Sequence, residues 1–247
     1  MSSTKWCIVA DTSVARVLGL LPARGGSKGI AGKNLKDLHG RPLLGWAAAA
    51  LAEATTVDYR MCCSDSEAIL EVARRFGLRT PWLRPPHLAE DTSLVIDVIR
   101  HALDTLQEQE GLAFTHVALV QATSPTVQTQ DIDAAVKLAL ESRADTVIAG
   151  YEAGQRHPSA MFTLDNERKA HWILPADVRM ARRQDLPPVF VRTGLIYVIS
   201  VEMLRRTGSI YGENISAVII PEERAITIDT MTDFRIAQIL LEESING

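Results

Sequence analysis

A glycine-rich basic loop is the part of this sequence whose residue types and spacing could do chemistry. It contains four glycines interleaved with three cations: Arg24, Gly25, Gly26, Lys28, Gly29, Gly32 and Lys33. Glycine lets the backbone come close to a ligand, and successive N–H groups in such a loop form a concavity that binds anions. The cations add charge and hydrogen-bond donors. We therefore expect this loop to bind a polyphosphate.

The spacing of the loop differs from two common phosphate-binding motifs. Lys33 is followed by Asn34, so the G-K-[ST] ending of one motif is missing, and G-x-G-x-x-G is absent as well. A plain basic surface loop is the alternative interpretation, because glycine and lysine are also common in turns.

The elements that must position this loop alternate between strand-like and helical patterns. The expected strands are residues 17–21, 57–63, 78–83, 116–120, 146–149, 190–200 and 215–220, with a further short β-branched run at 226–228. One helix is expected to begin at Pro42, and others cover residues 67–76, 91–108 (capped by residues 91–93), 131–140 and 233–243. Strands separated by helices of this length indicate a parallel sheet covered on both faces.

Polar residues follow three of the predicted strands at the point where each strand ends. They are the glycine loop, Ser64-Asp65, and residues 121–125. Because ligands of parallel α/β sheets bind outside the carboxyl ends of the strands, these segments predict one site on one rim. The alternation breaks at residues 151–190, which we interpret as an insertion covering the site within a single domain of residues 1–247.

Length and composition narrow the classes of function. A chain of 247 residues with 47% hydrophobic residues fits one α/β domain. The net charge of −4 gives no reason to expect binding to nucleic acid or an anionic membrane. No apolar run approaches the ~20 residues of a membrane span, and Asp11 and Arg16 interrupt the first apolar stretch too early for a secretory signal. A cytoplasmic location is the expectation.

The literal sequence of the loop, L-P-A-R-G-G-S-K-G-I-A-G-K-N at residues 21–34, resembles the signature of the acylneuraminate cytidylyltransferase family. Four further stretches of the family pattern follow in the same order. They are R-P-P-H-L-A-E-D-T at 84–92, Q-A-T-S-P-T-V at 121–127, R-Q-D-L-P with T-G-L-I-Y at 183–187 and 193–197, and I-T-I-D-T at 226–230 with Asp233. The resemblance thus covers nearly the whole chain.

This resemblance implies an α/β, Rossmann-like three-layer fold of the nucleotide-diphospho-sugar transferase type, with a mostly parallel sheet. A small insertion and dimerisation subdomain would occupy about residues 151–215. The implied activity is CTP-dependent cytidylyl transfer to an acidic acceptor, a nonulosonic or sialic-type acid, with release of pyrophosphate. Mg²⁺ is the implied cofactor and a homodimer the implied assembly.

On the nucleotide side, the resemblance implies a set of residues that hold CTP: Leu21, Ala23, Arg24, Gly25, Ser27, Lys28, Lys33, Asn34, Arg84, Thr92 and Ser93. Without the resemblance, Arg84 could be a surface arginine held by the prolines after it. Thr92 and Ser93 could equally cap the helix that follows.

Three residues are the candidates for catalysis: Lys28, Arg24 and Asp229. Asp229 is also the implied Mg²⁺ ligand, because a carboxylate is the usual protein ligand of a magnesium ion that bridges phosphates. The alternative for Asp229 is a cap of the last helix, where Thr230 and Asp233 could also serve. No side chain in the motifs is an obvious general base.

On the acceptor side, the resemblance implies contacts from Gln121, Thr123, Ser124, Arg183, Tyr197 and Tyr211. Arg183 would bind the acceptor carboxylate, since a guanidinium group can donate two parallel hydrogen bonds to it. Arg182 is its neighbour and a competing candidate. Tyr211 would reach the site from the partner subunit.

The departures from the family pattern collect on the acceptor side. Thr227 stands where many members have aspartate, and Ala122, Val127 and Ala160 replace the family's proline, arginine and lysine. We therefore expect CTP to be kept and the acceptor to differ from ordinary N-acetylneuraminate. The alternatives are a different anionic acceptor, such as a phosphonate or a Kdo-like acid, and a CTP-binding regulator without activity. A dinucleotide-dependent oxidoreductase is disfavoured because no G-x-G-x-x-G follows a strand.

Overall fold

The computed structural model describes residues 16–27, 29–180 and 182–246. Its centre is a six-stranded sheet in the order β10-β6-β9-β5-β1-β4. The strands are β1 (Val17–Pro22), β4 (Tyr59–Cys63), β5 (His116–Val120), β6 (Thr146–Glu152), β9 (Phe190–Ser200) and β10 (Ile215–Ile219). All neighbouring pairs are parallel except those of β9, which runs antiparallel to both β5 and β6. The predicted mostly parallel sheet is confirmed.

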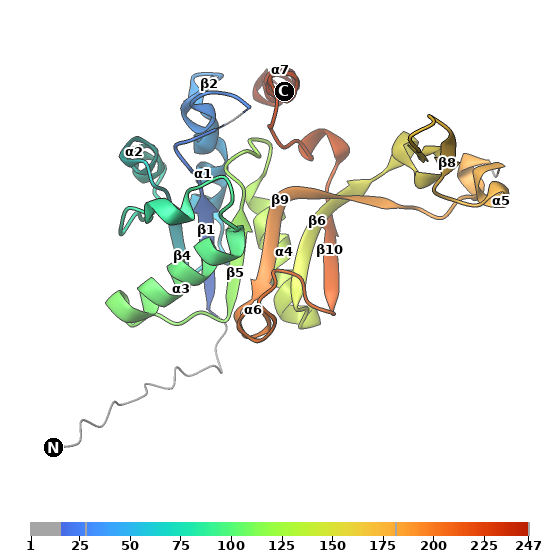
Figure 1. Cartoon of the computed structure of the whole chain (residues 1–247). Helices are drawn as coiled ribbons and strands as arrows, with labels where there is room; N and C mark the ends of the chain where they lie inside the picture. The colour runs from blue at the N-terminus through green and yellow to red at the C-terminus, as the bar shows by residue number, and fades with distance from the viewer. Residues whose placement is uncertain (1–15, 28, 181, 247) are drawn as a thin grey trace.

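Helices cover both faces of the sheet, as the predicted three-layer arrangement requires (Figure 1). One face packs against α1 (Leu43–Glu53), α2 (Glu67–Arg75) and α4 (Thr129–Ser142), and the other against α3 (Val95–Glu110) and α6 (Val201–Thr207). Successive residues of β1 alternate between the two faces. Leu18 and Leu20 face α3, whereas Leu21 faces α1. At Gly19 an added Cβ would lie 2.7 Å from side-chain carbons of Leu51 and Val57, so only glycine lets α1 pack this closely.

The C-terminal helix α7 (Met231–Asn246) packs on a smaller cluster beside the main core. This cluster includes Leu38, at the end of the short strand β2 (Asp37–Leu38) that pairs with β3 (Arg41–Pro42), and Leu43 at the start of α1. Phe234, Ala237 and Leu241 are its buried contributions from α7. The helix thereby holds the segment before it, residues 226–230, against the glycine loop. No helix in the described part of the chain is long and apolar enough to span a membrane.

Three local predictions are wrong. Residues 78–83 form no strand: Arg79 makes a single bridge to Met61, and the chain continues as a loop through Pro81 and Pro85, which lack the N–H that a ladder needs. α3 begins at Val95 with Leu94 at its N-cap, after residues 91–93. Residues 226–228 are also not a strand, since they make one backbone hydrogen bond, from Ile228 N–H to the Thr123 carbonyl.

The predicted insertion is an arm that prolongs β6 and β9 beyond the sheet. It carries the hairpin β7 (Phe162–Leu164) and β8 (Ala170–Trp172) and the short helix α5 (Ala176–Met180). Figure 1 shows the arm reaching away from the body on the side of β6 and β10, rather than folding over its own chain's glycine loop. The expectation that it covers the site within its own chain is therefore wrong.

The Asp133 carboxylate on α4 stabilises the turn between α1 and β4 through hydrogen bonds. Asp133 accepts hydrogen bonds from the Thr55 hydroxyl (2.8 Å) and from the Thr56 amide and hydroxyl (3.0 and 2.7 Å). Partial burial raises the pKa of Asp133, but the hydrogen bonds from Thr56 and Thr55 outweigh it and bring the pKa below its ordinary value. This stabilisation is therefore present at neutral pH and is lost as pH falls through the lowered pKa.

We expect Asp133→Asn to reduce the free energy of unfolding at pH 7 by on the order of 1–2 kcal/mol, because charge-assisted hydrogen bonds are lost. The difference from wild type should shrink towards pH 3, because the stabilisation by the charged carboxylate begins to be lost once pH falls below the ordinary pKa of aspartate. Urea unfolding at pH 7 and at pH 3 measures this difference, with Asp97→Asn, at a half-exposed carboxylate of α3, as the control. An equal difference at both pH values would contradict the assignment.

Candidate active site

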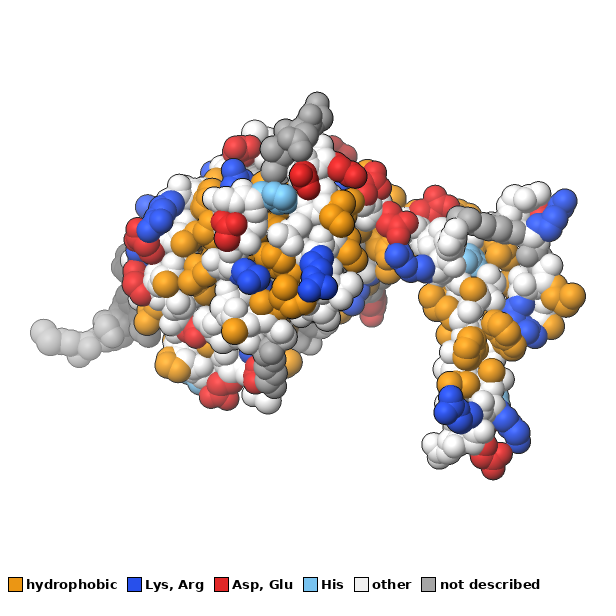
Figure 2. Space-filling model, turned by 90° about the horizontal axis from the view of Figure 1, so that it is seen from above, with side chains coloured by type: hydrophobic (Ala, Val, Ile, Leu, Met, Phe, Trp, Pro, Cys, Tyr) orange, Lys and Arg blue, Asp and Glu red, His pale blue; other side chains and the backbone are white. Residues whose placement is uncertain are grey.

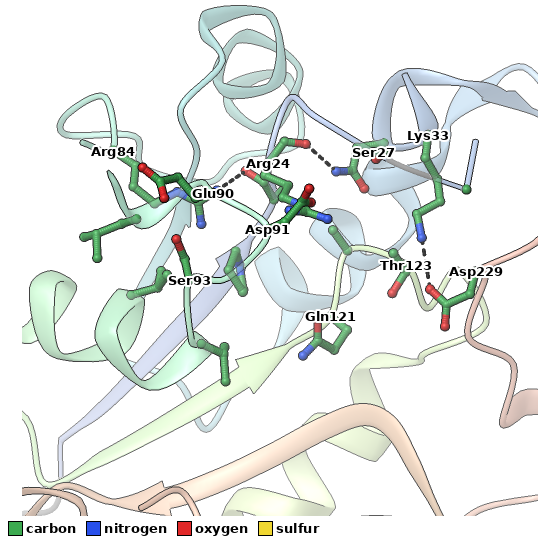
Figure 3. Close-up of a pocket in the computed structure, with 18 residues that line it drawn as sticks. Arg24, Ser27, Lys33, Arg84, Glu90, Asp91, Ser93, Gln121, Thr123 and Asp229 are labelled. Carbon is green, nitrogen blue, oxygen red and sulfur yellow. Dashed lines mark hydrogen bonds and ion pairs between the residues drawn. The ribbon is translucent and has the colours of Figure 1, made fainter. Parts of the chain in front are cut away.

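A cavity of about 460 Å³ opens at the carboxyl ends of the adjacent parallel strands β1 and β5 (Figure 3). Residues 22–24 continue from β1 into its wall, and residues 121–123 continue from β5. The glycine loop forms another side, through Ser27, Gly29 and Lys33. The loop thus lines a cavity on the rim of the sheet, in agreement with the predicted position, and is not a plain surface turn.

Ten of the predicted site residues line this cavity: Ala23, Arg24, Ser27, Lys33, Asn34, Arg84, Ser93, Gln121, Thr123 and Asp229. Four others lie beside it. Leu21 is fully buried in β1, Gly25 donates its N–H to Asp65, Thr92 is exposed, and Ser124 is fully buried. Lys28 and the side chain of Arg183 lie outside the described residues.

Lys33 and Asp229 tie the glycine loop to the segment before α7. The Lys33 ammonium group donates to the Ile228 carbonyl (2.6 Å) and to Asp229 Oδ1 (3.1 Å), and Figure 3 shows the two side chains pointing at each other. The same two segments touch at Gly29, where an added Cβ would lie 2.5 Å from the Asp229 carbonyl oxygen. Only glycine permits this approach. The Asp229 side chain is 77% exposed, so its carboxylate remains available to a ligand.

Thr230 and Asp233, rather than Asp229, cap the last helix, and the Thr230 hydroxyl accepts a hydrogen bond from the Asp233 N–H (3.3 Å). The Asp233 carboxylate accepts hydrogen bonds from the N–H groups of Asp229 (3.0 Å) and Thr230 (2.7 Å) and from the Thr230 hydroxyl (2.9 Å). Burial raises the pKa of Asp233, but these hydrogen bonds and the charge of Lys33 lower it below its ordinary value overall. The alternative role considered for Asp229 is therefore already filled, and its side chain is left facing the cavity.

Two nearly buried polar side chains form the inner wall. Arg84 is 4% exposed, and one of its Nη atoms lies 3.4 Å from both the Ala23 carbonyl and Asp65 Oδ1. Asn34 is 6% exposed and donates to the Arg24 carbonyl (2.9 Å). Arg84 Nε and Asn34 Oδ1 are buried without a hydrogen-bond partner among the described residues. Burying such a group without a hydrogen-bond partner costs about 1–3 kcal/mol of folding free energy. We therefore expect a ligand or a water molecule to bind these two atoms.

Acidic residues that sequence reasoning did not assign to the site also line the cavity. Asp91 forms an ion pair with Arg24 at 2.6 Å, and Glu90 lies next to it. The sequence contained a signal for Asp91, because this residue belongs to the stretch 84–92 that carries the resemblance to the family. The pairing itself joins residues 67 positions apart and could not be read from the sequence.

The residues present fit a magnesium ion through a single carboxylate. Among the residues that the structure describes, no group of three or more His, Cys, Asp or Glu side chains could hold a metal. Mg²⁺ needs no such cage, because it is commonly bound by one or two carboxylates together with substrate phosphates and waters. Asp229 supplies the exposed carboxylate, while the Thr227 hydroxyl lies 3.4 Å from the Ser124 hydroxyl and adds no charge.

The two predicted acceptor tyrosines lie together on the α3 and α6 face, beyond the cavity. Tyr197 of β9 and Tyr211 pack edge to face with ring centres 6.2 Å apart, and both phenol oxygens accept hydrogen bonds from Arg192 Nη1. Burial, followed by the hydrogen bond with Tyr211, raises the pKa of Tyr197 to about 12. Tyr211, which the resemblance places in a partner's site, contacts its own chain here. β9 links this group to the cavity, because the Leu195 carbonyl accepts from the Gln121 N–H.

Comparison of the structure with solved structures defines the fold. It superposes on a CMP-2-keto-3-deoxy-manno-octonic acid synthetase complexed with CTP, with a TM-score of 0.68 and 14% identity over 93% of this chain and all of that one. It also superposes on 4-diphosphocytidyl-2C-methyl-D-erythritol synthase from Anaerococcus prevotii, with a TM-score of 0.62 and 12% identity over 92% and 99% of the two chains. The fold is that of the α/β nucleotidyltransferases.

Sequence comparison identifies the family within this class. The cytidylyltransferase family model matches residues 18–213, and the chain belongs to that family. It is 27% identical to pseudaminic acid cytidylyltransferase of Campylobacter jejuni, over 90% of this chain and 95% of that protein. It is 29% identical to CMP-N,N'-diacetyllegionaminic acid synthase of Legionella pneumophila, over 92% and 97%. The predicted family, fold and enzyme class, a CTP-dependent nucleotidyltransferase, are confirmed.

Proposed function

We propose that this enzyme transfers CMP from CTP to the hydroxyl group of a nonulosonic acid and releases pyrophosphate. The observation that carries the proposal is the cavity at the ends of β1 and β5, where the glycine loop, Lys33 and Asp229 meet. A glycine loop with a lysine and a nearby carboxylate is suited to a magnesium-bound triphosphate. Relatives named for pseudaminic and legionaminic acids support a nonulosonic acid as the acceptor.

The cavity residues divide between the nucleotide and its phosphates. The buried wall formed by Asn34 and Arg84 offers an unpaired acceptor and an unpaired donor, which suits recognition of a base. Arg24, Ser27 and Lys33 belong to the glycine loop and would contact the triphosphate, with Lys28 joining them on the strength of the resemblance. We expect Arg24 to exchange its ion pair with Asp91 for phosphate oxygens.

Catalysis in this proposal rests on positioning and charge neutralisation. The acceptor oxygen attacks the α-phosphorus of CTP in line with the bond to the leaving pyrophosphate. Lys33 and the loop N–H groups neutralise charge that moves to the phosphate oxygens, and Gln121 positions the acceptor at the end of β5. Asp229 would hold Mg²⁺, which supplies further neutralisation of phosphate charge when bound.

A panel of acidic acceptors tests the proposal. We expect pyrophosphate release with CTP, Mg²⁺ and pseudaminic or legionaminic acid, and weaker release with N-acetylneuraminate because of the acceptor-side substitutions. Release only with Kdo or a small phosphonate would contradict the proposed acceptor. CTP binding without release from any of these acids would favour a regulator that has lost catalysis.

We also propose that the arm holds two copies of the enzyme together. Its described surface is unusually apolar for so small a unit: Phe162 and Trp172, which pack edge to face at 5.5 Å, remain 50% and 47% exposed, and Met180 is 85% exposed. Figure 2 shows hydrophobic side chains along the arm, separated from the body. Exposed apolar patches of this kind mark interaction surfaces, and a second copy of this chain as the partner agrees with the homodimer that the family resemblance implies.

The proposal also places the enzyme in the cytoplasm, where CTP is available.

The double variant Phe162→Glu/Trp172→Glu should be a monomer of 27.1 kDa, whereas wild type should be a dimer of twice that mass. Two buried charges would destabilise an apolar interface. Light scattering after size exclusion measures the mass, and Ile239→Glu, at an exposed apolar residue of α7, is the matched control. A double variant that stays dimeric would show that the arm is not the interface.

A further inference from the structure

Arg192 is a cation of β9 that does not itself line the cavity and that none of the motifs assigns. It lies on β9, three residues before Leu195, whose carbonyl accepts the Gln121 N–H, and two before Gly194, which packs near the Thr227 side chain. Gln121 lines the cavity, and Thr227 stands two residues before Asp229. Arg192 therefore lies on the strand that hydrogen-bonds to Gln121 of the cavity wall, on the opposite side of β5 from the wall formed by Asn34 and Arg84.

The guanidinium group of Arg192 is held by two aromatic rings. Its Nη1 donates to the phenol oxygens of both Tyr197 and Tyr211, and its Cζ lies 5.8 and 5.6 Å from the two ring centres. Tyr197 is itself only 5% exposed, so one of the two holders belongs to the core. A long side chain held in this way loses little conformational freedom when it binds a ligand.

The remaining donors of Arg192 match a carboxylate. A guanidinium group has five N–H donors, and the two on Nη1 are used by the tyrosines. Nε and Nη2 make no hydrogen bond, and Arg192 makes no ion pair, within the part of the chain that the structure describes. The edge formed by Nε and Nη2 can donate two parallel hydrogen bonds, which is the geometry that a planar carboxylate accepts.

We infer that Arg192 binds the carboxylate of the acidic acceptor and so determines the acceptor class. The inference rests on the proposed function, and it assigns the carboxylate to a residue other than Arg183. The two tyrosines then orient the guanidinium group so that its free edge faces the acceptor. An uncharged acceptor of the same shape would leave this cation without its partner.

The test compares wild type with Arg192→Gln, Arg192→Lys and, as a control, Arg206→Gln, an exposed arginine of α6 without an ion pair among the described residues. Each protein is assayed at saturating CTP with pseudaminic acid and with its carboxamide. We expect Arg192→Gln to lower kcat/KM for the acid by roughly 10- to 100-fold, as for the loss of a charge-assisted pair, with KM for CTP unchanged. The kcat/KM of Arg192→Lys should lie between those of wild type and Arg192→Gln, and the kcat/KM of Arg206→Gln should equal that of wild type.

The ratio of acid to carboxamide activity separates a binding role from a structural one. Wild type should prefer the acid, and this preference should largely vanish in Arg192→Gln. If Arg192→Gln loses acid and carboxamide activity in equal proportion, or keeps the wild-type preference, the inference is overturned while the proposed function stands. If wild type neither turns over nor binds pseudaminic acid by calorimetry in the presence of CTP, both the proposed function and the inference are overturned.

Discussion

Lys33→Ala should lower kcat/KM for CTP by about 100-fold or more, the cost typical of removing one preorganised donor from a site where charge develops. The side chain lines the cavity and is only 13% exposed, so its ammonium group is already fixed in place by the Ile228 carbonyl and Asp229. Its loss removes a cation from the proposed triphosphate site. It also releases the tie between the glycine loop and the segment before α7.

Steady-state pyrophosphate release measures this effect, and Lys137→Ala on the exposed face of α4 is the matched control. Lys33→Arg tests geometry, because it keeps the charge but changes the shape of the donor. We expect Lys33→Arg to recover only part of the activity. Wild-type kcat/KM in Lys33→Ala would contradict the assignment of Lys33 to the phosphates.

Asp229→Asn should lower kcat by a similar factor and raise the Mg²⁺ concentration needed for half-maximal activity. Asparagine keeps the shape of the side chain and can still accept a hydrogen bond from Lys33, so the fold should be unchanged. Only the charge that attracts a hard cation is removed. Because Asp233 already caps α7, a loss of stability is not expected from this variant.

The two readouts for Asp229→Asn are the magnesium titration of activity and the melting temperature. Asp104→Asn, at an exposed carboxylate of α3 paired with Arg205, controls for the loss of one surface charge. An unaltered magnesium profile with reduced activity would mean that Asp229 acts on Lys33 alone. A lowered melting temperature with normal activity would assign it a structural role instead.

The sequence predicted the core of the sheet because its strands are continuous buried runs. β5 was predicted at its observed bounds because an unbroken aliphatic run follows His116, and β9 was predicted at residues 190–200 although Arg192 and Gly194 interrupt its apolar run. Residues 78–83 also contain apolar side chains, but they follow a turn at Gly77 and meet Pro81, so they extend without joining the sheet. The local sequence pattern cannot distinguish a strand that joins the sheet from an extended loop, because pairing depends on the neighbouring strand.

The candidate site was predictable where one contiguous stretch, the glycine loop, carried the information in its composition and literal sequence, and not where contacts between distant residues decide it. Gly29 is required because the Asp229 backbone lies against it, 200 residues further along the chain. The ion pair between Arg24 and Asp91 likewise joins distant segments. The site roles of the individual residues stay predictions until the variants above are measured.

The role inferred for Arg192 bears on the acceptor-side substitutions. The family pattern loses a proline, an arginine and a lysine at Ala122, Val127 and Ala160, and this chain has a guanidinium group held by Tyr197 and Tyr211 on β9. If Arg192 binds the acceptor carboxylate, it supplies a cation for the acceptor where the two basic residues of the pattern are missing. The nucleotide side, with Asn34 and Arg84 buried in its wall, needs no such change.

The fate of the α-phosphate of CTP tests the central claim most directly. The enzyme would be incubated with Mg²⁺, pseudaminic acid and CTP labelled with ³²P at either the α- or the γ-phosphate, and the products separated. The account predicts that α-label moves into an acceptor conjugate that resists phosphatase, while γ-label leaves as pyrophosphate. Transfer of γ-label to the acceptor, or retention of both labels in unchanged CTP across the acidic acceptors, would contradict cytidylyl transfer by this chain.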